Sequence, residues 1–231
     1  MPHLSQHCIF YSMDFRNTAK GDVFDALAVV VKAIANGHRL ELVELMAQGE
    51  HSVEELARMS GMAVTTTSAH LQNLKQAGLV RTRRERTTIY YQLAGDDVAE
   101  LYVAAKRVAL RRSPALRDTL DDYLGAPSAA GGTIDPGAVT ESMTVVDVRP
   151  RSEFDTGHFP GAISIPLADL PARVHELPAD RSVVVYCRGE FCRLAREAAH
   201  LMREHGLDAV AMDEGVVEWR ASKAVALDGV A

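Results

Sequence analysis

The amino-acid sequence predicts two domains, a mainly helical domain followed by an α/β domain built on a parallel sheet. In the first half, apolar residues recur at helical spacing in several separate runs. The run GAPSAAGG, residues 125–132, contains only small residues, Gly and Pro, as linkers do. Beyond it, short apolar runs alternate with a helical pattern, which favours a parallel sheet. The predicted domains are residues 14–124 and 133–231.

Four helices are predicted early in the chain, and each helical pattern ends at a glycine: residues 22–36, 38–48, 53–60 and 64–77. The third helix begins at a capping box, because Ser52 precedes Glu55 by three residues.

A β-hairpin is predicted at Leu79–Leu93, where Thr, Ile and Tyr are abundant and the charged run RRER separates two extended runs. Residues 96–124 return to helix, and Pro114 marks a point where that helix breaks or restarts. Its apolar stripe is Val98, Leu101, Tyr102, Ala105, Val108 and Ala109.

The second half contains three strand candidates and one clear helix candidate. The strands are residues 144–148, 182–186 and 209–212, and the helix is residues 193–205, ended by Gly206.

Composition and charge exclude several classes of protein. With 47% hydrophobic and 24% charged residues the chain has ordinary globular composition. It contains no apolar run of ~18 residues, the length that would predict a membrane span. The net charge of −6 lies in residues 125–231, so the neutral first half can still carry a basic surface. Three cysteines do not suggest a secreted disulfide scaffold, and the start, where Met13 is an alternative to Met1, lacks a signal peptide. We expect a cytoplasmic protein without a cofactor and with no clear role for Cys8.

The helices at 53–60 and 64–77 form a helix-turn-helix, and the hairpin after them forms a wing. Thr67, Leu71 and Leu74 fall on an inward stripe of the second helix. The outward residues, expected to approach phosphates and base edges of double-stranded DNA, are Thr65, Thr66, Ser68, Gln72 and Lys75. An equally open alternative is that Thr65 or Thr66 only caps the helix.

Four arginines crowd the predicted wing: Arg81, Arg83, Arg84 and Arg86. Only Glu85 opposes them within the hairpin. Such a run is often just a solvated turn, but its place directly after the helix-turn-helix favours contact with DNA phosphates.

The runs AIANGHRLELVELMAQGEHSVEELA and TTTSAHLQNLKQAGLVRTRRERTTIYYQL resemble the ArsR-type repressors. The resemblance covers roughly residues 20–120. It implies a homodimer, built from the first and last helices (about 22–36 and 97–123), that binds an inverted-repeat operator and releases it when an effector binds.

The metal-sensing sites of that family have no counterpart here. The helix SVEELARMS has no cysteine pair, and the last helix has no His/Asp cluster, so no metal site is predicted. His70 is interpreted as structural.

In the second half, the run VVVYCRGEFCRLAREAA places Cys187 just after a strand and just before a helix. Backbone N–H groups, the helix N-terminus, Arg188 and Arg193 are expected to lower the pKa of this thiol and favour the nucleophilic thiolate. The alternative is that Cys187 is simply a small apolar residue at the end of a buried strand.

The runs DVRPRSEFDTGHFPGAISIP (147–166), YCRGEFC and DEGVVEWRA (213–221) resemble the rhodanese superfamily over about residues 133–225. The resemblance implies an α/β domain whose cysteine, here Cys187, takes sulfur as a persulfide from thiosulfate, polysulfide or another sulfane donor and passes it to a thiol acceptor. The other residues it implies for the site are the loop residues Arg188, Gly189, Glu190, Phe191 and Cys192, and the framework residues Asp147 and Arg149. It assigns His158 a structural role in a turn.

Two features depart from that pattern. Cys192, at the sixth loop position, could resolve a persulfide on Cys187 into a disulfide or polysulfide link, or be inert. Cys187 and Arg193 also read as C-x5-R, the spacing with which related folds hold phosphate or arsenate, although Arg193 could equally be an exposed helix residue.

The leading hypothesis is a sulfur-responsive, homodimeric repressor whose rhodanese-like domain generates or relays the signal. The alternatives are a protein that is mainly a sulfurtransferase, an arsenate reductase or phosphatase, and a binding domain without catalysis. Sulfurtransferase activity itself is left as an open expectation.

Overall fold

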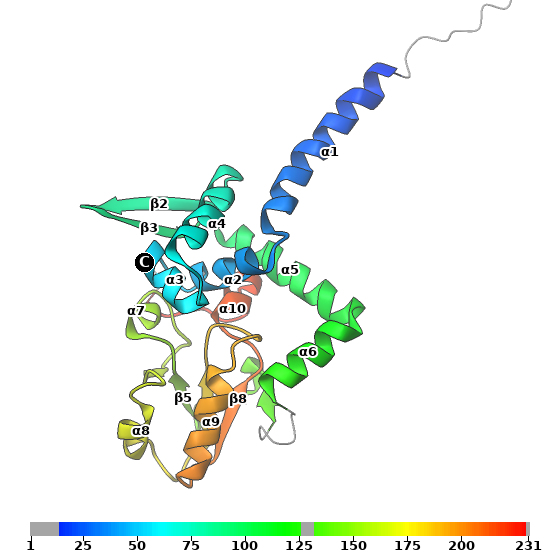
Figure 1. The fold of residues 1–231 in the computed structure, drawn as a ribbon. Coiled ribbons are helices and arrows are strands. Elements are labelled where there is room, and N and C mark those ends of the chain that lie inside the picture. The colour runs from blue at the N-terminus through cyan, green and yellow to red at the C-terminus, as the bar shows by residue number, and fades with distance from the viewer. Residues whose placement is uncertain (1–13, 126–131, 230–231) are drawn as a thin grey trace, which may run out of the picture.

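The computed structural model describes residues 14–125 and 132–229, with side chains from residue 19 onward, and it has a helical upper part packed on an α/β lower part (Figure 1). The mainly helical winged helix-turn-helix and the α/β domain with a parallel sheet are both present, as predicted. Cys8, Met13 and most of the expected linker lie outside the described residues.

The helical part contains six helices within the described residues: α1 (Asp14–Ile34), α2 (Gly37–Met46), α3 (Val53–Ser60), α4 (Val64–Gln76), α5 (Asp96–Arg112) and α6 (Pro114–Leu124). Gly37 begins α2 rather than ending α1, because Asn36 is extended and its side chain accepts the backbone N–H of Arg39 at 3.3 Å. The predicted capping box of Ser52 and Glu55 is confirmed at α3. The helix restarts at Pro114, where the Ser113 hydroxyl caps α6.

A three-stranded antiparallel sheet accompanies these helices, with β1 (His51–Ser52), β2 (Val80–Glu85) and β3 (Thr88–Leu93) in the order β1-β3-β2. The hairpin is confirmed, but the run RRER is not its turn. Pairing continues to Glu85 and Thr88, so the turn is at Arg86, whose φ of 54° lies in the left-handed region. The two-residue strand β1 was not predicted.

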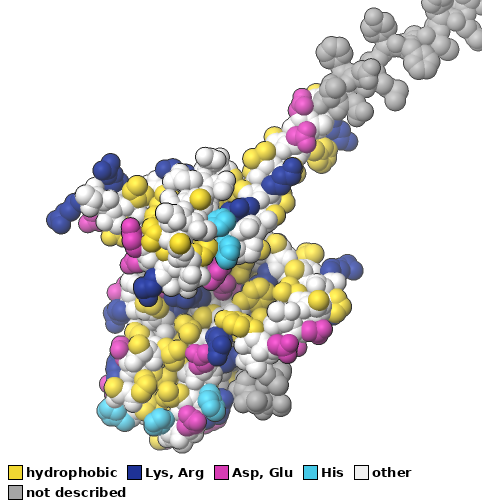
Figure 2. All heavy atoms as spheres, in the orientation of Figure 1, with side chains coloured by type: hydrophobic (Ala, Val, Ile, Leu, Met, Phe, Trp, Pro, Cys, Tyr) yellow, Lys and Arg dark blue, Asp and Glu magenta, His cyan; other side chains and the backbone are white. Residues whose placement is uncertain are grey.

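Helix α1 extends away from the rest of the molecule and exposes apolar side chains along its length (Figures 1 and 2). They include Val23, Phe24, Leu27 and Val31. On α5 the predicted stripe is divided, because Val98 and Tyr102 are buried in their own domain while Val108 is 61% exposed. The accessible apolar surface therefore lies mainly on α1.

The second domain is a five-stranded parallel sheet in the order β4-β8-β7-β5-β6. Its strands are β4 (Thr133–Ile134), β5 (Thr144–Asp147), β6 (Ile163–Ser164), β7 (Val183–Tyr186) and β8 (Ala209–Met212). Its helices are α7 (Arg151–Phe154), α8 (Leu170–Arg173), α9 (Leu194–Glu204) and α10 (Val216–Ser222), with 3-10 turns at Pro136–Ala138 and Val174–Glu176. The three predicted strands and the helix α9 are confirmed.

Alternate residues of β7 enter separate cores on the two faces of the sheet, as the two-residue period of a strand requires. Val183 and Val185 pack with the apolar side of α9, including Ala198 and Met202. Val184 and Tyr186 pack in the other core, which contains Trp219 of α10. Cys187, directly after the strand, therefore lies on the side of α9.

Helix α10 joins the two domains, because it lies against α5 beneath the helical part (Figure 1). Val217 is fully buried and belongs to the core of the helical domain. Lys223 and Arg220 of the same region form ion pairs with Asp96 at the start of α5. The domains are therefore joined by packed side chains as well as by the chain itself. In the part of the chain that the structure describes, no helix is both long and apolar enough to cross a membrane.

Candidate functional site

Helix α4 has one exposed polar face and one face that is buried in the domain core. Thr67, Leu71 and Leu74 are fully buried, as predicted. The predicted outward residues do face outward: Thr65, Thr66, Gln72 and Lys75 are exposed and Ser68 is partly exposed. The N-cap is Ala63, which makes no side-chain cap. The capping interpretation of Thr65 and Thr66 is therefore wrong, and their hydroxyls are at the surface of the first turn.

Two hydrogen bonds tie α4 to the wing. The Gln72 side-chain amide donates to the Tyr91 hydroxyl at 3.0 Å, and the Lys75 ammonium donates to the Thr82 hydroxyl at 3.1 Å. These contacts fix the angle between helix and hairpin, so that both elements would meet DNA as one surface.

The wing arginines are not equivalent. Arg83 donates to both oxygens of Glu50, pairs with Glu85 at 2.8 Å, and lies 4.7 Å above the Tyr90 ring. Glu85 is the one acidic residue of the hairpin itself, and the residue before β1 supplies Glu50 as a second carboxylate from outside it.

The other wing arginines are less engaged by carboxylates. Arg81 donates to the Gln92 side-chain oxygen at 3.2 Å. Arg84 and Arg86 are exposed at the turn, where the Arg84 Nε donates to the Arg86 carbonyl at 3.1 Å. Figure 2 shows Lys and Arg side chains at the projecting end of this hairpin. The tip therefore offers the charge for phosphate contact.

The loop after β7 holds two thiols close together. Cys187 is only 2% exposed, and its thiol donates to the backbone carbonyl of Cys192 at 3.3 Å. The backbone N–H of Cys192 donates to the Gly189 carbonyl at 2.9 Å, which closes the loop into a tight turn. Cys192 is partly exposed.

The expectation of a lowered pKa at Cys187 is wrong. Burial raises the pKa of this thiol well above its usual value, against the backbone N–H groups of Ala195 and Gly189. The positive charge of Arg188 is already compensated, because it pairs at 2.6 Å with Glu153, which is itself buried. The local sequence shows the arginine but not the carboxylate that the fold places opposite it.

At Cys192 the pKa is shifted in the other direction. Hydrogen bonding from the Cys187 thiol lowers the pKa of Cys192, and the backbone N–H groups of Arg188 and Leu194 lower it further, against burial. Leu194 begins α9, so the N-terminal end of that helix faces the thiol. Of the two thiols, Cys192 is therefore the one whose surroundings favour the thiolate.

Arg193 does not form a buried anion cradle with Cys187. It is the N-cap residue of α9, its side chain is 51% exposed, and it forms an ion pair with Glu197. Its guanidinium lies 5.7 Å from the centre of the Tyr123 ring. This exposed position disfavours the C-x5-R interpretation.

The predicted framework residues Asp147 and Arg149 form a fully buried ion pair at 2.6 Å. Arg149 also donates to the Gly157 carbonyl at 2.8 Å and to the Gln48 side-chain oxygen at 3.0 Å. The structure thus places them under the domain junction and away from the cavity that Cys192 lines.

The two histidines interpreted as structural make packing contacts. His158 stacks on Phe154 with ring centres 3.7 Å apart, and its Nδ1 lies 3.0 Å from the Phe154 carbonyl oxygen. His70 lies 5.6 Å from the His38 ring. Among the described residues, no group of three or more His, Cys, Asp or Glu side chains could hold a metal ion.

Side chains of the helical domain contact the cysteine loop directly. Lys106 of α5, with a side chain 3% exposed, pairs with Glu190 of the loop at 3.3 Å and also with Glu218 of α10. The Gln48 amide donates to the Arg188 carbonyl at 3.3 Å. Lys106 could have been found from the sequence, since it continues the buried spacing of Tyr102 on α5. Gln48 carries no such signal.

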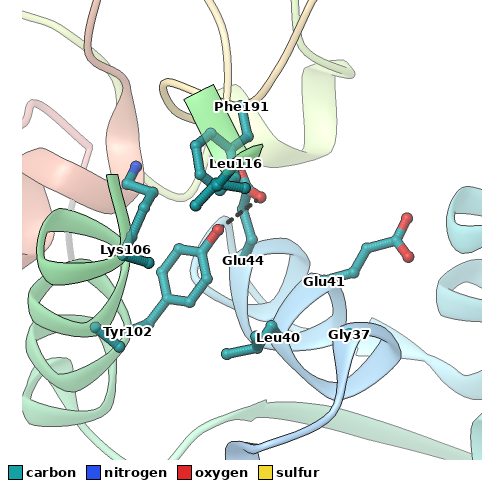
Figure 3. A pocket seen from close by; sticks show the side chains of 10 residues that line it. Gly37, Leu40, Glu41, Glu44, Tyr102, Lys106, Leu116 and Phe191 are labelled. Atoms are coloured by element: carbon teal, nitrogen blue, oxygen red, sulfur yellow. Dashed lines mark hydrogen bonds between the residues drawn. The ribbon is translucent and has the colours of Figure 1, made fainter. Parts of the chain in front are cut away.

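Glu44 of α2 lies at the centre of this junction (Figure 3), where its carboxylate accepts the Tyr102 hydroxyl at 3.0 Å. Burial raises its pKa to about 7, and the negative charge of Glu218 adds to the shift, against Lys106 and the Tyr102 hydrogen bond. A Cβ at Gly189 would lie 3.0 Å from oxygens of both Glu44 and Glu218. Val217 lies closer still, 2.6 Å from that position through its Cγ1, so the side chains of α2 and α10 pack directly on the loop backbone at this glycine.

We predict that replacing Arg84 and Arg86 together by Ala weakens DNA binding and reduces the slope of log K against log salt by about 2. Arg83→Ala should change the slope less, because Glu50 and Glu85 already neutralise that charge. Fluorescence anisotropy on a labelled duplex across a salt series measures both. Arg173→Ala, an arginine paired with Glu176 in the other domain, is the matched control. An unchanged slope in the double variant would contradict the role of the wing tip.

A second prediction concerns Glu44. Between pH 4.5 and about 7 its carboxyl keeps a proton in the folded chain that the unfolded chain releases, so the free energy of unfolding falls as pH rises through this window. Glu44→Gln should remove this fall. The free energy of unfolding at pH 8 minus that at pH 5 should therefore be about 2 kcal/mol more positive in the variant than in wild type. Urea unfolding at both pH values measures it, with the exposed Glu100→Gln as control. Parallel pH profiles of wild type and Glu44→Gln would refute the shift.

Comparisons with known proteins identify both halves. Residues 36–82 match the family described as "Bacterial regulatory protein, arsR family", and residues 133–222 match "Rhodanese-like domain". The chain is 44% identical over 203 residues to the HTH-type transcriptional regulator Rv0324 of Mycobacterium tuberculosis, covering 87% of this chain and 90% of that protein.

Two further relatives match single domains. A sulfurtransferase of Allochromatium vinosum is 34% identical over 82 residues, 36% of this chain and 76% of its own length. A solution structure of a homodimeric winged helix-turn-helix DNA-binding domain from Mycobacterium bovis is 42% identical, covers 50% of this chain and 95% of that one, and has a TM-score of 0.39. The match to Rv0324 spans more residues than either domain contains, so it includes both. The chain therefore belongs to the ArsR-family DNA-binding transcriptional regulators, and it carries a rhodanese domain after its winged helix-turn-helix.

Proposed function

We propose that this regulator is a homodimeric repressor whose affinity for an inverted-repeat operator depends on sulfane sulfur bound at the Cys187–Cys192 loop. The observation that carries the proposal is the direct contact between this loop and the DNA-binding domain. Glu190 of the loop pairs with Lys106 of α5, and the Arg188 carbonyl accepts the side chain of Gln48.

The two thiols can convert a sulfur donor into a change of loop shape. A sulfane donor such as polysulfide or thiosulfate leaves one sulfur atom as a persulfide, for which Cys187 is the proposed carrier. Attack of the second thiol on the inner sulfur then forms a Cys187–Cys192 disulfide and breaks the S–S bond of the persulfide, so that the outer, transferred sulfur leaves as sulfide with the electron pair. A small thiol acceptor would reverse the disulfide and reset the loop.

The residues between the two cysteines would carry the change to α5. Glu190 and Phe191 lie between Cys187 and Cys192 in sequence, and both contact Lys106, the second through its ring at 5.0 Å. Drawing the two sulfur atoms together moves this short segment, and Lys106 then loses a carboxylate partner at a buried position. Lys106 would keep Glu218 as its remaining carboxylate partner, and because a buried ammonium is costly when its pairing is weakened, α5 would shift or the junction would open.

A dimer is supported by the apolar surface of α1. Val23, Phe24 and Leu27 are each more than half exposed, which is costly for a helix that stays alone in water. Two-fold symmetry would match an operator with two half-sites.

The test is an operator shift assay with the full chain, before and after treatment with inorganic polysulfide. We expect the Cys8→Ser chain to lose operator affinity at least 10-fold on treatment and to regain it with dithiothreitol. The variant that also carries Cys187→Ser and Cys192→Ser should bind the operator in both conditions.

A further variant tests the route. Lys106→Met, which keeps the apolar stem, should still take up sulfur but respond less on DNA. If the variant without Cys187 and Cys192 loses the operator as the parent does, the loop is not the sensor.

A second candidate function is sulfurtransferase activity, supported by the likeness of the second domain to the A. vinosum sulfurtransferase. A thiosulfate:cyanide assay beside arsenate and phosphate-ester assays distinguishes it from oxyanion chemistry. Fast turnover with no effect of polysulfide on DNA binding would favour the enzyme over the sensor.

A further inference from the structure

We propose that the cavity between α2, α5, α6 and the cysteine loop binds a small hydrophobic amine, a molecule with an apolar body and one ammonium group (Figure 3). Neither Cys187 nor Cys192 lines this cavity, so the inference goes beyond the sulfur chemistry proposed above. It gives the regulator a second small-molecule ligand, held where the two domains meet.

The cavity is large enough for a small organic molecule. Its volume is about 490 Å³, within the roughly 300–1,000 Å³ of sites for drug-sized ligands. Most of its wall is apolar: Leu40 of α2, Tyr102, Ala105 and Ala109 of α5, Leu116 of α6 and Phe191 of the loop. A ligand that enters would therefore bury an apolar body against side chains of both domains.

The charges of the wall favour a cation. Among the described residues that line it, the charged ones are Glu41, Glu44 and Lys106. Lys106 does not balance the two carboxyl groups, because its ammonium already pairs with Glu218 and, at 3.3 Å, with Glu190. An anionic ligand would meet these carboxylates and an ammonium that is already engaged, whereas a ligand ammonium would be attracted.

Glu44 is the carboxyl group placed to hold that ammonium. Figure 3 shows its side chain pointing toward Tyr102, while Glu41 points away from Tyr102. The Glu44 Oε2 accepts the Tyr102 hydroxyl at 3.0 Å, which fixes the direction of the carboxyl group. At Glu41, partial burial raises the pKa and the nearby His38 lowers it. The rings of Tyr102 and Phe191 line the same cavity, and aromatic ring faces also attract cations.

Groups outside the wall do not reverse this preference. Arg188 of the loop acts on Glu44, but its guanidinium pairs with Glu153 at 2.6 Å. Tyr123 of α6 also lies near Glu44 and is held neutral, because burial raises its pKa. Neither side chain therefore supplies an unpaired positive charge for an anionic ligand.

The protonation of Glu44 makes this recognition depend on pH. Burial raises the pKa of Glu44 to about 7, and the negative charge of Glu218 adds to the shift. Lys106, Tyr102 and Arg188 oppose it. Below this pH the carboxyl group is neutral and attracts an ammonium only weakly, and above it the carboxylate is ionised. An amine that stays protonated throughout should therefore bind more tightly at pH 8 than at pH 6.

The experiment compares three probes that differ in one terminal group: phenylpropylamine, phenylpropanol and phenylpropanoate. Isothermal titration calorimetry with the full chain measures the Kd of each. The amine, with about ten non-hydrogen atoms, should bind with a Kd near ~1 mM at pH 8. We expect the alcohol to bind at least about 5-fold more weakly and the propanoate more weakly still. At pH 6 the Kd of the amine should rise at least about 3-fold.

Glu44→Gln tests the charge. This variant should bind the amine at least about 5-fold more weakly at pH 8 and lose the dependence on pH, while the alcohol binds within about 2-fold of the parent. Glu100→Gln, at an exposed position of α5 that does not line the cavity, is the matched control and should behave as the parent.

Ala109→Phe tests the place, because it fills the cavity from α5. It should raise the Kd of the amine at least about 10-fold. Ala104→Phe is the same change at an exposed position of α5 that does not line the cavity, and it should leave the Kd within about 2-fold. Operator binding by both variants checks that they are folded.

Each contrary outcome removes a defined part of the inference. An amine and an alcohol that bind equally would overturn the ligand class, and unchanged amine binding by Ala109→Phe would overturn the site. A dimer that becomes a monomer in sedimentation of Ala109→Phe alone would show that a second copy of the chain fills the cavity. The chain with Cys187→Ser and Cys192→Ser should bind the amine as the parent does, so failure of the sulfur proposal is distinguished from failure of this one.

Discussion

The buried ammonium of Lys106 is the interaction on which the joined architecture depends. Its side chain is 3% exposed, so its charge must be paired by groups that the fold brings to it. Those groups come from two places in the second domain, Glu218 of α10 and Glu190 of the cysteine loop. Removing one partner of a buried pair costs about 3–5 kcal/mol, which makes the α5–α10 contact hard to open while the loop keeps its shape.

The same contact joins the cysteine loop directly to the DNA-binding domain. A loop that only turned over its substrate would need no charged residue facing the other domain. Here Glu190 and Phe191 lie between two cysteines and also contact α5. The loop in which we propose the chemistry therefore contacts α5 directly, and no long pathway is needed between the loop and the helix.

Local signals in the sequence were enough for most of the fold. Glycines after each helical run, the Ser52–Glu55 capping box and the valine runs of β5 and β7 predict their elements because neighbouring residues decide them. The short strands β1, β4 and β6 have two residues each, too few to show a period. The hairpin turn was misplaced because charged residues in RRER are typical of turns, yet the ladder continues through them.

The candidate sites were predicted by position but not by environment. The sequence places Arg188 beside Cys187 and Arg83 in the wing, and both are there. Their partners Glu153 and Glu50 are 35 and 33 residues distant, so the compensation of each charge depended on tertiary structure. The lowered pKa expected for Cys187 therefore lies at Cys192 instead. Glu44 and Gln48 could not be identified from the sequence for the same reason, because their partners are also distant in the chain.

Residues 48–51 have a mechanical consequence. The Gln48 carbonyl accepts the Thr156 hydroxyl, Glu50 holds Arg83, and His51 pairs with Tyr91 in the sheet. One end of this four-residue segment is thus anchored in the rhodanese domain and the other in the wing. So short a segment has little slack with which to absorb a displacement by bending. A rotation of the second domain would therefore be passed through these residues to the hairpin.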